Sequence, residues 1–252
     1  MSELDEQGWV VVRNVVPPDE LAAFTDIFTT LIPDVPYPRG RDGRIVWEFT
    51  GSSHHHEGVA AIARNPRFGA LVARALNASR VQLLQDSLLY KPAHEGGTVE
   101  WHQDHTYVGF FNEPRVVALR IALLPEDESN GCMRVVDGSH RWGPVGDVRA
   151  LREARVDSVL PSLTDAQRDA IAHARPLTLA AGDVSIHHCL TLHGSLPNTS
   201  AQPRRTIILR MFDGACRLDR SALPAGSDQH FPTDDDGHLS SDRFPIVFDS
   251  EP

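Results

Sequence analysis

The chain has 252 residues and a formal net charge of −10, with 24 Lys and Arg against 34 Asp and Glu. This acidic balance argues against nucleic acid as the main partner, because a nucleic-acid-binding face must neutralise phosphates with clustered basic side chains. No stretch approaches the ~20 apolar residues of a membrane span. The polar, acidic N-terminus is not typical of a secretory signal, and three widely spaced cysteines are typical of reduced thiols. We therefore expect a cytoplasmic protein with no membrane or nucleic-acid partner.

The first third of the chain carries strand and helix signals in turn. WVVVRNVV (9–16) is apolar and β-branched, which favours a strand. PPDELAAFTDIFTTLI follows with prolines and acids first and apolar residues at helical spacing, so it predicts an amphipathic helix. Residues 57–77 are also helical in pattern, interrupted at Asn65-Pro66. The three histidines at 54–56 we interpret as a surface loop rather than a mobile lid.

From residue 80 onward the hydrophobic period becomes two, which is typical of strands. One helix is predicted within this part, over 162–175. The pattern predicts a mainly β fold with flanking helices, in which the strands form a double-sheet jelly roll, also called a double-stranded β-helix or cupin-like core. We expect one domain over 1–252, made of an N-terminal strand and helices (about 8–77), a jelly-roll core (about 80–213) and a C-terminal loop region (214–252). The strand-like runs are VQLLQDSLLYKP, VVALRIALLP, CMRVVDGS, PLTLAAGDVSIHH and RTIILRMF.

The stretch EWHQDH holds three potential metal ligands, His102, Asp104 and His105. Alternate residues of a strand point to the same face, so His102 and Asp104 share a face that excludes His105. An imidazole and a carboxylate are two corners of the 2-His-1-carboxylate set that binds Fe(II). An isolated triplet of this kind is weak evidence, because it often arises by chance.

A third ligand has to come from elsewhere, and GDVSIHHCLTLHGS offers His187, His188 and His193. His193 ends an apolar run just before a glycine, where a side chain can project from a barrel mouth. His187 and His193 share strand parity, whereas His188 has the opposite parity. Spacing alone leaves all three open.

Two arginines, Arg204 and Arg205, stand at the start of the apolar run PRRTIILRMF. An arginine facing the interior from such a strand needs an anion, since an unpaired buried charge is strongly unfavourable. Its guanidinium fork matches a carboxylate. Arg205 alternates to the other face and is predicted to be solvated.

The motifs taken together resemble the phytanoyl-CoA dioxygenase family of iron and 2-oxoglutarate oxygenases. The similarity runs from about residue 8 to about 213 and rests on the order and spacing of several segments. They are GWVVVRNVVPPDEL, HQD (102–104), NGCMRVVDGSHRWG (130–143), HGSLPNTS (193–200) and PRR (203–205).

This resemblance implies Fe(II) as the metal, with 2-oxoglutarate and O2 as co-substrates. It assigns the metal to His102, Asp104 and His193. It assigns the distal carboxylate of 2-oxoglutarate to Arg204, eleven residues after His193. Other positions that match co-substrate or substrate contacts in some relatives are Ser195, Lys91 and Gln85.

The resemblance further implies hydroxylation of an aliphatic carbon of a small molecule, with release of succinate and CO2. Asp104 favours hydroxylation over halogenation, because related halogenases replace this carboxylate with a small residue. Desaturation, cyclisation or epimerisation at the same site are the alternatives. A non-catalytic binding barrel is a further alternative, against which the intact triad and Arg204 argue.

Arg120, in VVALRIALL, departs from the family, since many relatives carry an aromatic residue there. A second inward-facing arginine is explained equally by a buried ion pair or by contact with an acidic group of a ligand. His105 and Tyr107 follow the metal motif, so they are candidates for the substrate side. The sequence names neither the substrate nor the oligomeric state.

Overall fold

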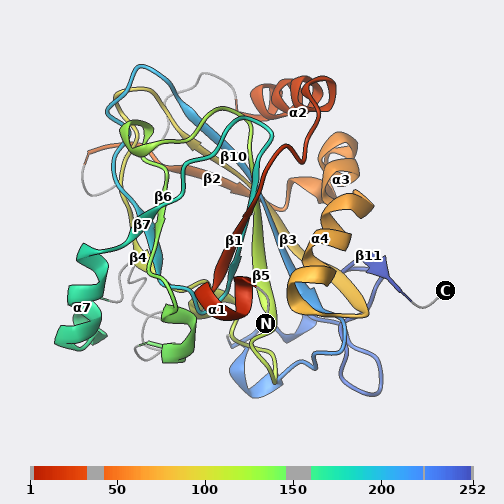
Figure 1. Ribbon diagram of the computed structural model, residues 1–252. Helices are drawn as coiled ribbons and strands as arrows, with labels where there is room; N and C mark the ends of the chain where they lie inside the picture. The colour runs from red at the N-terminus through yellow and green to blue at the C-terminus, as the bar shows by residue number, and fades with distance from the viewer. Residues whose placement is uncertain (1–2, 33–42, 146–159, 224, 251–252) are drawn as a thin grey trace.

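The computed structural model describes residues 3–32, 43–145, 160–223 and 225–250. Two antiparallel sheets face each other, with helices on the outside of the larger one (Figure 1). The larger sheet has seven strands in the order β1-β8-β5-β10-β3-β11, with β2 paired to β3. The smaller sheet has four, in the order β4-β9-β6-β7. This arrangement is the predicted jelly roll.

The large sheet contains β1 (Trp9–Val12), β2 (Trp47–Thr50), β3 (Arg80–Lys91), β5 (Val116–Ala122), β8 (Val184–His188), β10 (Arg204–Asp213) and β11 (Ile246–Asp249). The small sheet contains β4 (Val99–His102), β6 (Met133–Val135), β7 (Arg175–Pro176) and β9 (His193–Ser195). The α-helices are α1 (Glu3–Gln7), α2 (Pro18–Leu31), α3 (Glu57–Ala63), α4 (Pro66–Leu76), α5 (His105–Val108) and α7 (Asp165–Ala172). None of the helices in the described ranges is long and apolar enough to cross a membrane.

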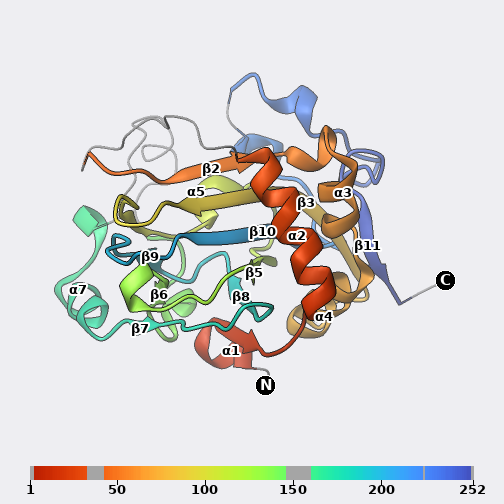
Figure 2. The same cartoon turned by 90° about the horizontal axis from the view of Figure 1, so that it is seen from above.

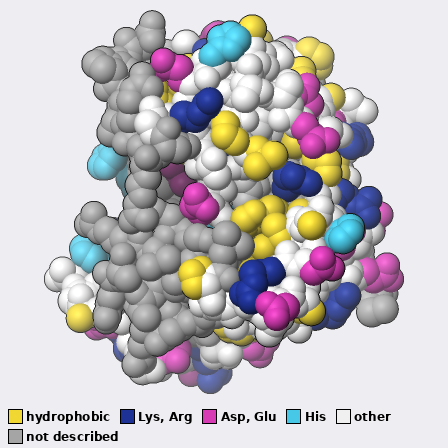
Figure 3. Space-filling model, turned by 90° about the vertical axis from the view of Figure 1, so that its left-hand side faces the viewer, with side chains coloured by type: hydrophobic (Ala, Val, Ile, Leu, Met, Phe, Trp, Pro, Cys, Tyr) yellow, Lys and Arg dark blue, Asp and Glu magenta, His cyan; other side chains and the backbone are white. Residues whose placement is uncertain are grey.

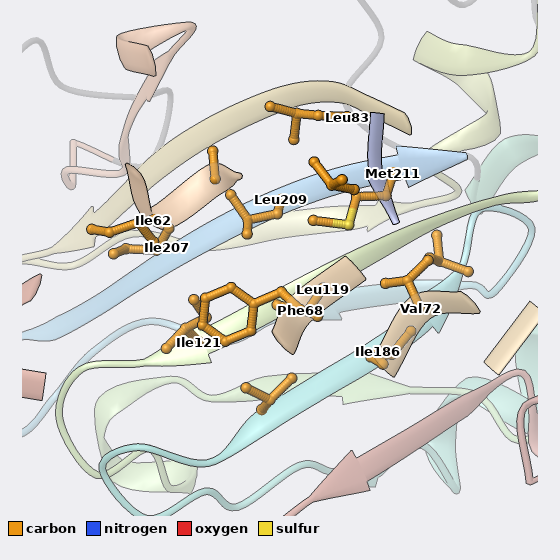
Figure 4. Close-up of a cluster of buried hydrophobic side chains, with 14 of the residues drawn as sticks. Ile62, Phe68, Val72, Leu83, Leu119, Ile121, Ile186, Ile207, Leu209 and Met211 are labelled. Carbon is orange, nitrogen blue, oxygen red and sulfur yellow. The ribbon is translucent and has the colours of Figure 1, made fainter. Parts of the chain in front are cut away.

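The outer face of the large sheet is the main hydrophobic core, because helices α2 to α4 cover it (Figures 1 and 2). Phe28 from α2 and Phe68 from α4 are almost completely buried there. Burying an aromatic side chain of this size contributes roughly 1.5–3 kcal/mol. Figure 4 shows the strand side of this core, formed by residues such as Leu83, Leu119, Ile121, Ile186, Ile207, Leu209 and Met211.

The inner face of the large sheet, turned toward the small sheet, carries the polar residues of the same strands. On β10, Ile207, Leu209 and Met211 belong to the helix-covered core. The alternate residues Arg204, Ile208 and Arg210 line a cavity between the sheets. Strand alternation therefore divides one strand between a scaffold and a cavity.

The pairing of β3 with β10 is irregular at one point. Arg210 pairs with Gln85 and the next residue, Met211, pairs with Leu83, so β3 has one extra residue there. This is the pattern of a β-bulge, a feature that often occurs beside active sites.

Several local predictions need correction. The C-terminal region is more than loop, because β11 joins the edge of the large sheet against β3. The first strand ends at Val12, and the helix predicted over 162–175 is confined to α7, where Thr164 and Gln167 form a capping box.

His54 ends a short 3-10 helix (Ser52–His54), His55 and His56 connect it to α3, and none of the three histidines lines the cavity between the sheets. His54 and His55 are exposed, and the His56 ring accepts a hydrogen bond from the Val59 N–H as the N-cap of α3. This agrees with a surface loop. The predicted single-domain organisation stays a prediction. On the face shown in Figure 3, charged side chains of both signs are interspersed with apolar ones.

Candidate active site

The centre of the cavity holds His102, Asp104 and His193. His102 at the end of β4 and His193 at the start of β9 are direct partners across the small sheet, and their ring centroids lie 4.2 Å apart. Asp104 Oδ1 lies 3.7 Å from His102 Nε2 and 3.9 Å from His193 Nε2. One ligand atom from each of the three residues lies within 4.8 Å of the others. The three side chains thus converge on a point that a metal ion can occupy.

The strand argument for pairing His102 with Asp104 does not describe the local backbone. β4 ends at His102, and Asp104 is the N-cap residue of α5 with φ −57° and ψ −26°. The turn from strand to helix brings the carboxylate back toward His102 Nε2. The pair converges as predicted, but by a bend in the chain rather than by strand alternation.

The ring orientations of both histidines are fixed by backbone carbonyls. His102 Nδ1 lies 2.7 Å from the Glu100 carbonyl, and His193 Nδ1 lies 2.9 Å from the Thr191 carbonyl. A nitrogen that faces a carbonyl carries the hydrogen and donates it, which leaves Nε2 as the lone-pair donor. Both Nε2 atoms face Asp104 Oδ1.

These donors fit Fe(II). Asp104 Oδ1 is buried and has no hydrogen-bond partner among the described residues, a condition that a metal ion would relieve. Two neutral imidazoles and one carboxylate on one side are the facial donor set of non-haem Fe(II) enzymes. Among the residues that the structure describes, this is the one cluster of His, Cys, Asp and Glu found with metal-binding geometry.

The electrostatics keep Asp104 and His193 deprotonated. Burial opposes the charge of Asp104, but Arg210 and the neighbouring His187 and His193 rings outweigh it and hold the pKa of this carboxyl well below its ordinary value. Burial, followed by the His102 and His187 rings, holds the pKa of His193 well below its ordinary value. A metal therefore has few protons to displace.

Sequence reasoning missed or left open two residues beside Asp104. Arg210, on the inner face of β10, has its Nε atom 3.6 Å from Asp104 Oδ2, and His187 Nε2 on β8 lies 3.3 Å from the same oxygen. His187 was one of three open candidates for the third ligand. Arg210 shares strand parity with Arg204, the signal by which it could have been found.

One end of the cavity is strongly cationic. Arg204 is buried, donates a hydrogen bond to the Gly131 carbonyl, and has an Nε atom without a hydrogen-bond partner among the described residues. Burial lowers the pKa of Arg204 to about 10. Lys91, also fully buried, donates from Nζ to Ser195 Oγ and to the Leu196 carbonyl, each at 2.7 Å. The Nε atom of Arg204, which lines the cavity, is a donor suited to an anion.

Arg120 makes a buried ion pair and also lines the cavity. Its Nη2 lies 3.1 Å from Glu126 Oε2, and the Thr206 hydroxyl donates to Glu126 Oε1 at 2.6 Å. Burial raises the pKa of Glu126, but Arg120 and Arg204 outweigh this and lower it. Glu126 thus neutralises one of two neighbouring arginines.

The cavity has a volume of about 870 Å³. The predicted residues Gln85 and Tyr107 line it, whereas His105 does not. Tyr107 is half exposed, with its ring 6.1 Å from the His102 ring, and Gln85 Oε1 accepts a hydrogen bond from Arg210 at 3.2 Å. Further lining residues that sequence reasoning did not select are Arg44, Glu48, Thr50, Glu100 and Met133.

Comparisons with known proteins agree with this geometry. The family model for phytanoyl-CoA dioxygenase (PhyH) matches residues 4–206. The chain is 30% identical over 232 residues to ectoine dioxygenase from Nocardia farcinica (strain IFM 10152), covering 83% of this chain and 75% of that protein. It is 32% identical over 174 residues to L-proline trans-4-hydroxylase from Streptomyces griseoviridis, covering 63% of this chain and 65% of that one. It also resembles the crystal structure of the epimerase SnoN in complex with Fe3+, alpha ketoglutarate and nogalamycin RO, with a TM-score of 0.76, 20% identity and coverage of 97% and 96% of the two chains.

A jelly roll with a His-Asp-His cluster in its cavity defines the class of non-haem iron oxygenases. The chain belongs to the phytanoyl-CoA dioxygenase family and is an Fe(II)- and 2-oxoglutarate-dependent dioxygenase.

Proposed function

We propose that this dioxygenase hydroxylates an aliphatic carbon of a small polar molecule, with release of succinate and CO2. One observation carries the proposal. Three convergent donors, His102, Asp104 and His193, share a cavity with a buried cationic end formed around Arg204.

The triad would hold Fe(II), which when bound supplies the activation of O2 and the oxidation of the substrate. Asp104 favours hydroxylation over halogenation, because a carboxylate at this place leaves no vacancy for a halide. The protein's own part is to hold Asp104 and His193 deprotonated, to orient the donors, and to keep the reacting groups away from bulk water.

The Arg204 end is proposed to bind 2-oxoglutarate. Glu126 forms its direct ion pair with Arg120, so of these two arginines Arg204 is the one whose guanidinium is proposed to bind the distal carboxylate. Ser195 Oγ accepts its hydrogen bond from Lys91, which leaves the hydroxyl hydrogen for a carboxylate oxygen of the co-substrate.

The Arg210 end is proposed to receive the substrate. Arg210 and Glu48 lie 3.3 Å apart there, Gln85 bonds Arg210, and Tyr107 lines the cavity beside the His102 ring. Charges of both signs suit a small molecule that itself carries polar or opposite charges better than a long apolar chain. Two relatives are named for ectoine and L-proline, which agrees with a small polar substrate. A cytoplasmic location and the absence of a nucleic-acid partner stay predictions from the sequence.

The first experiment tests the assignment of the site. Without oxygen, Fe(II) and 2-oxoglutarate should give the wild-type protein a visible charge-transfer absorption band. His102→Ala and Asp104→Ala should abolish it, and His105→Ala, a histidine outside the cavity, should keep it. An unchanged band in Asp104→Ala would contradict the metal assignment.

The second experiment tests the reaction. Small amino acids and cyclic polar acids are screened for substrate-stimulated succinate release, and the mass of each product is measured. A gain of one oxygen supports hydroxylation. A loss of two hydrogens indicates desaturation or cyclisation, and an unchanged mass indicates epimerisation, outcomes that keep the site and replace the proposed reaction.

A further inference from the structure

The two oxygens of Asp104 have different surroundings. Oδ1 faces the Nε2 atoms of His102 and His193 and has no hydrogen-bond partner among the described residues. Oδ2 faces the opposite way, 3.3 Å from His187 Nε2 and 3.6 Å from Arg210 Nε. The carboxylate is thus divided between the metal-binding point and two nitrogen donors.

Arg210 is held rigidly enough to keep this orientation. Its Nη1 donates to Glu48 Oε1 at 3.3 Å, Gln85 Oε1 at 3.2 Å and Ser87 Oγ at 3.2 Å, so acceptors from β2 and β3 anchor one branch of the guanidinium. Its Nε is buried and has no hydrogen-bond partner within the described ranges. Because a guanidinium is permanently protonated, this N–H is a constant donor facing Asp104.

His187 approaches the carboxylate from β8. The side chain is almost completely buried, and its ring centroid lies 4.4 Å from that of His193. Neither of its ring nitrogens has a hydrogen-bond partner in the described part of the chain. Its near neighbour is Oδ2 rather than Oδ1, and it is not one of the three residues whose ligand atoms converge.

We infer that Arg210 and His187 are positioning residues that hold Asp104 Oδ2, so that Asp104 offers a single oxygen to the metal. The inference rests on the proposed function. A carboxylate can bind a metal through one oxygen or through both, and binding through both would occupy a position that the co-substrate or O2 needs. Donors on the outer oxygen oppose that, as outer hydrogen-bond partners of metal ligands commonly do.

The test measures metal binding rather than turnover. Co(II) affinity of the metal-free protein is determined by calorimetry for wild type, Arg210→Met, His187→Phe and His187→Gln. The removal of an outer partner of a ligand typically lowers affinity by roughly 10–100-fold, so Arg210→Met and His187→Phe should each show such a loss. His187→Gln keeps an N–H donor near the position of Nε2 and should bind close to wild type. Arg205→Met, next to Arg204 on the other face of β10, is the matched control and should not differ from wild type.

The visible spectrum of bound Co(II) gives a second readout, because its intensity depends on coordination number. Arg210→Met should change that spectrum if Asp104 then binds through both oxygens.

Unchanged affinity and spectrum in Arg210→Met, with wild type binding one Co(II), would overturn the inference and leave the proposed function standing. His187→Gln as weak as His193→Ala would also overturn it, since His187 would then be a ligand. No stoichiometric binding by wild type would remove the proposed function itself, and the inference with it. Melting temperatures of the metal-free variants confirm that each is folded.

Discussion

The two faces of the large sheet are made by the same strands but have opposite chemistry. The face under α2 to α4 is a continuous apolar core, whereas the face toward the small sheet buries arginines, a lysine and carboxylates around a cavity. The outer face stabilises the fold, because buried apolar area is its dominant contribution. The inner face contributes little net stability, since buried charges lose most of their attraction to desolvation. Alternate residues of the same strands therefore serve different purposes: those on the outer face stabilise the fold, and those on the inner face line the active site.

The largest expected effect is on the outer face. Phe68→Ala removes a fully buried ring that packs edge-on against Phe24, and should lower the free energy of unfolding by about 4 kcal/mol. The affinity of the folded protein for 2-oxoglutarate should be unchanged. Urea unfolding and co-substrate titration at low temperature measure the two quantities. Phe49→Ala, at a ring that is 39% exposed, is the control and should cost less than about 0.5 kcal/mol.

The next largest expected effect on stability comes from the Arg120–Glu126 ion pair on the inner face, and it tests whether that face contributes to stability. Glu126→Met leaves Arg120 charged and buried without its partner, and should destabilise the protein by about 3 kcal/mol. The double variant Arg120→Met/Glu126→Met should recover most of this loss, because both charges are then gone. Urea unfolding of the three proteins completes the cycle. A double variant as unstable as Glu126→Met would mean that the Arg120–Glu126 pair gives the fold net stability, contrary to the comparison of the two faces.

Arg204→Met should change ligand binding with little change in stability. Loss of a buried charge partner costs about 3 kcal/mol in binding, which corresponds to a fall in 2-oxoglutarate affinity of ~100-fold. The absorption band of the Fe(II) and 2-oxoglutarate complex, titrated with co-substrate, measures it. Arg205→Met is the matched control, because Arg205 bonds Thr29 on α2 and lies over the Tyr90 ring on the outer side. Equal losses of 2-oxoglutarate affinity in Arg204→Met and Arg205→Met would contradict the assignment of ligand binding to the inner face of β10.

The smallest expected effect is that of acid on the buried carboxylate of Glu126, on the inner face. The folded-state pKa of Glu126 is lowered, so its charge stabilises the protein above the unfolded-state pKa of about 4.3. That contribution is lost as pH falls through the folded-state pKa. In this window the dependence of unfolding free energy on pH should be steeper for wild type than for Glu126→Gln, by up to about 1.4 kcal/mol per pH unit. Urea unfolding from about pH 6 to about pH 3 compares the slopes, and parallel slopes would exclude Glu126 as the source.

The sequence predicted the sheet-rich fold and the three convergent residues, because short motifs with fixed spacing carry both. It could not predict how His102 and Asp104 come together, because β4 ends at His102 and the turn into α5 brings the Asp104 carboxylate toward the histidine. The role of Arg210 and His187 beside Asp104 could not be predicted for another reason. Their significance depends on the position of one oxygen of Asp104, supplied by a segment about a hundred residues away. Strand β11 was not predicted, because a four-residue edge strand carries almost no periodic signal in the sequence.

The extra residue in β3 has a consequence for which side chains the cavity can contain. Before it, Val81 and Leu83 face the helices; after it, Leu88 and Tyr90 do, so the strand changes phase from odd to even. Gln85 accordingly reaches the cavity, where it accepts a hydrogen bond from Arg210. Leu84 is the residue of β3 without a partner on β10. Deleting it would restore one alternation along the whole strand, so the side chains of one half of β3 would turn to the wrong face of the sheet. The chain can vary the loops around the cavity far more freely than the length of this strand.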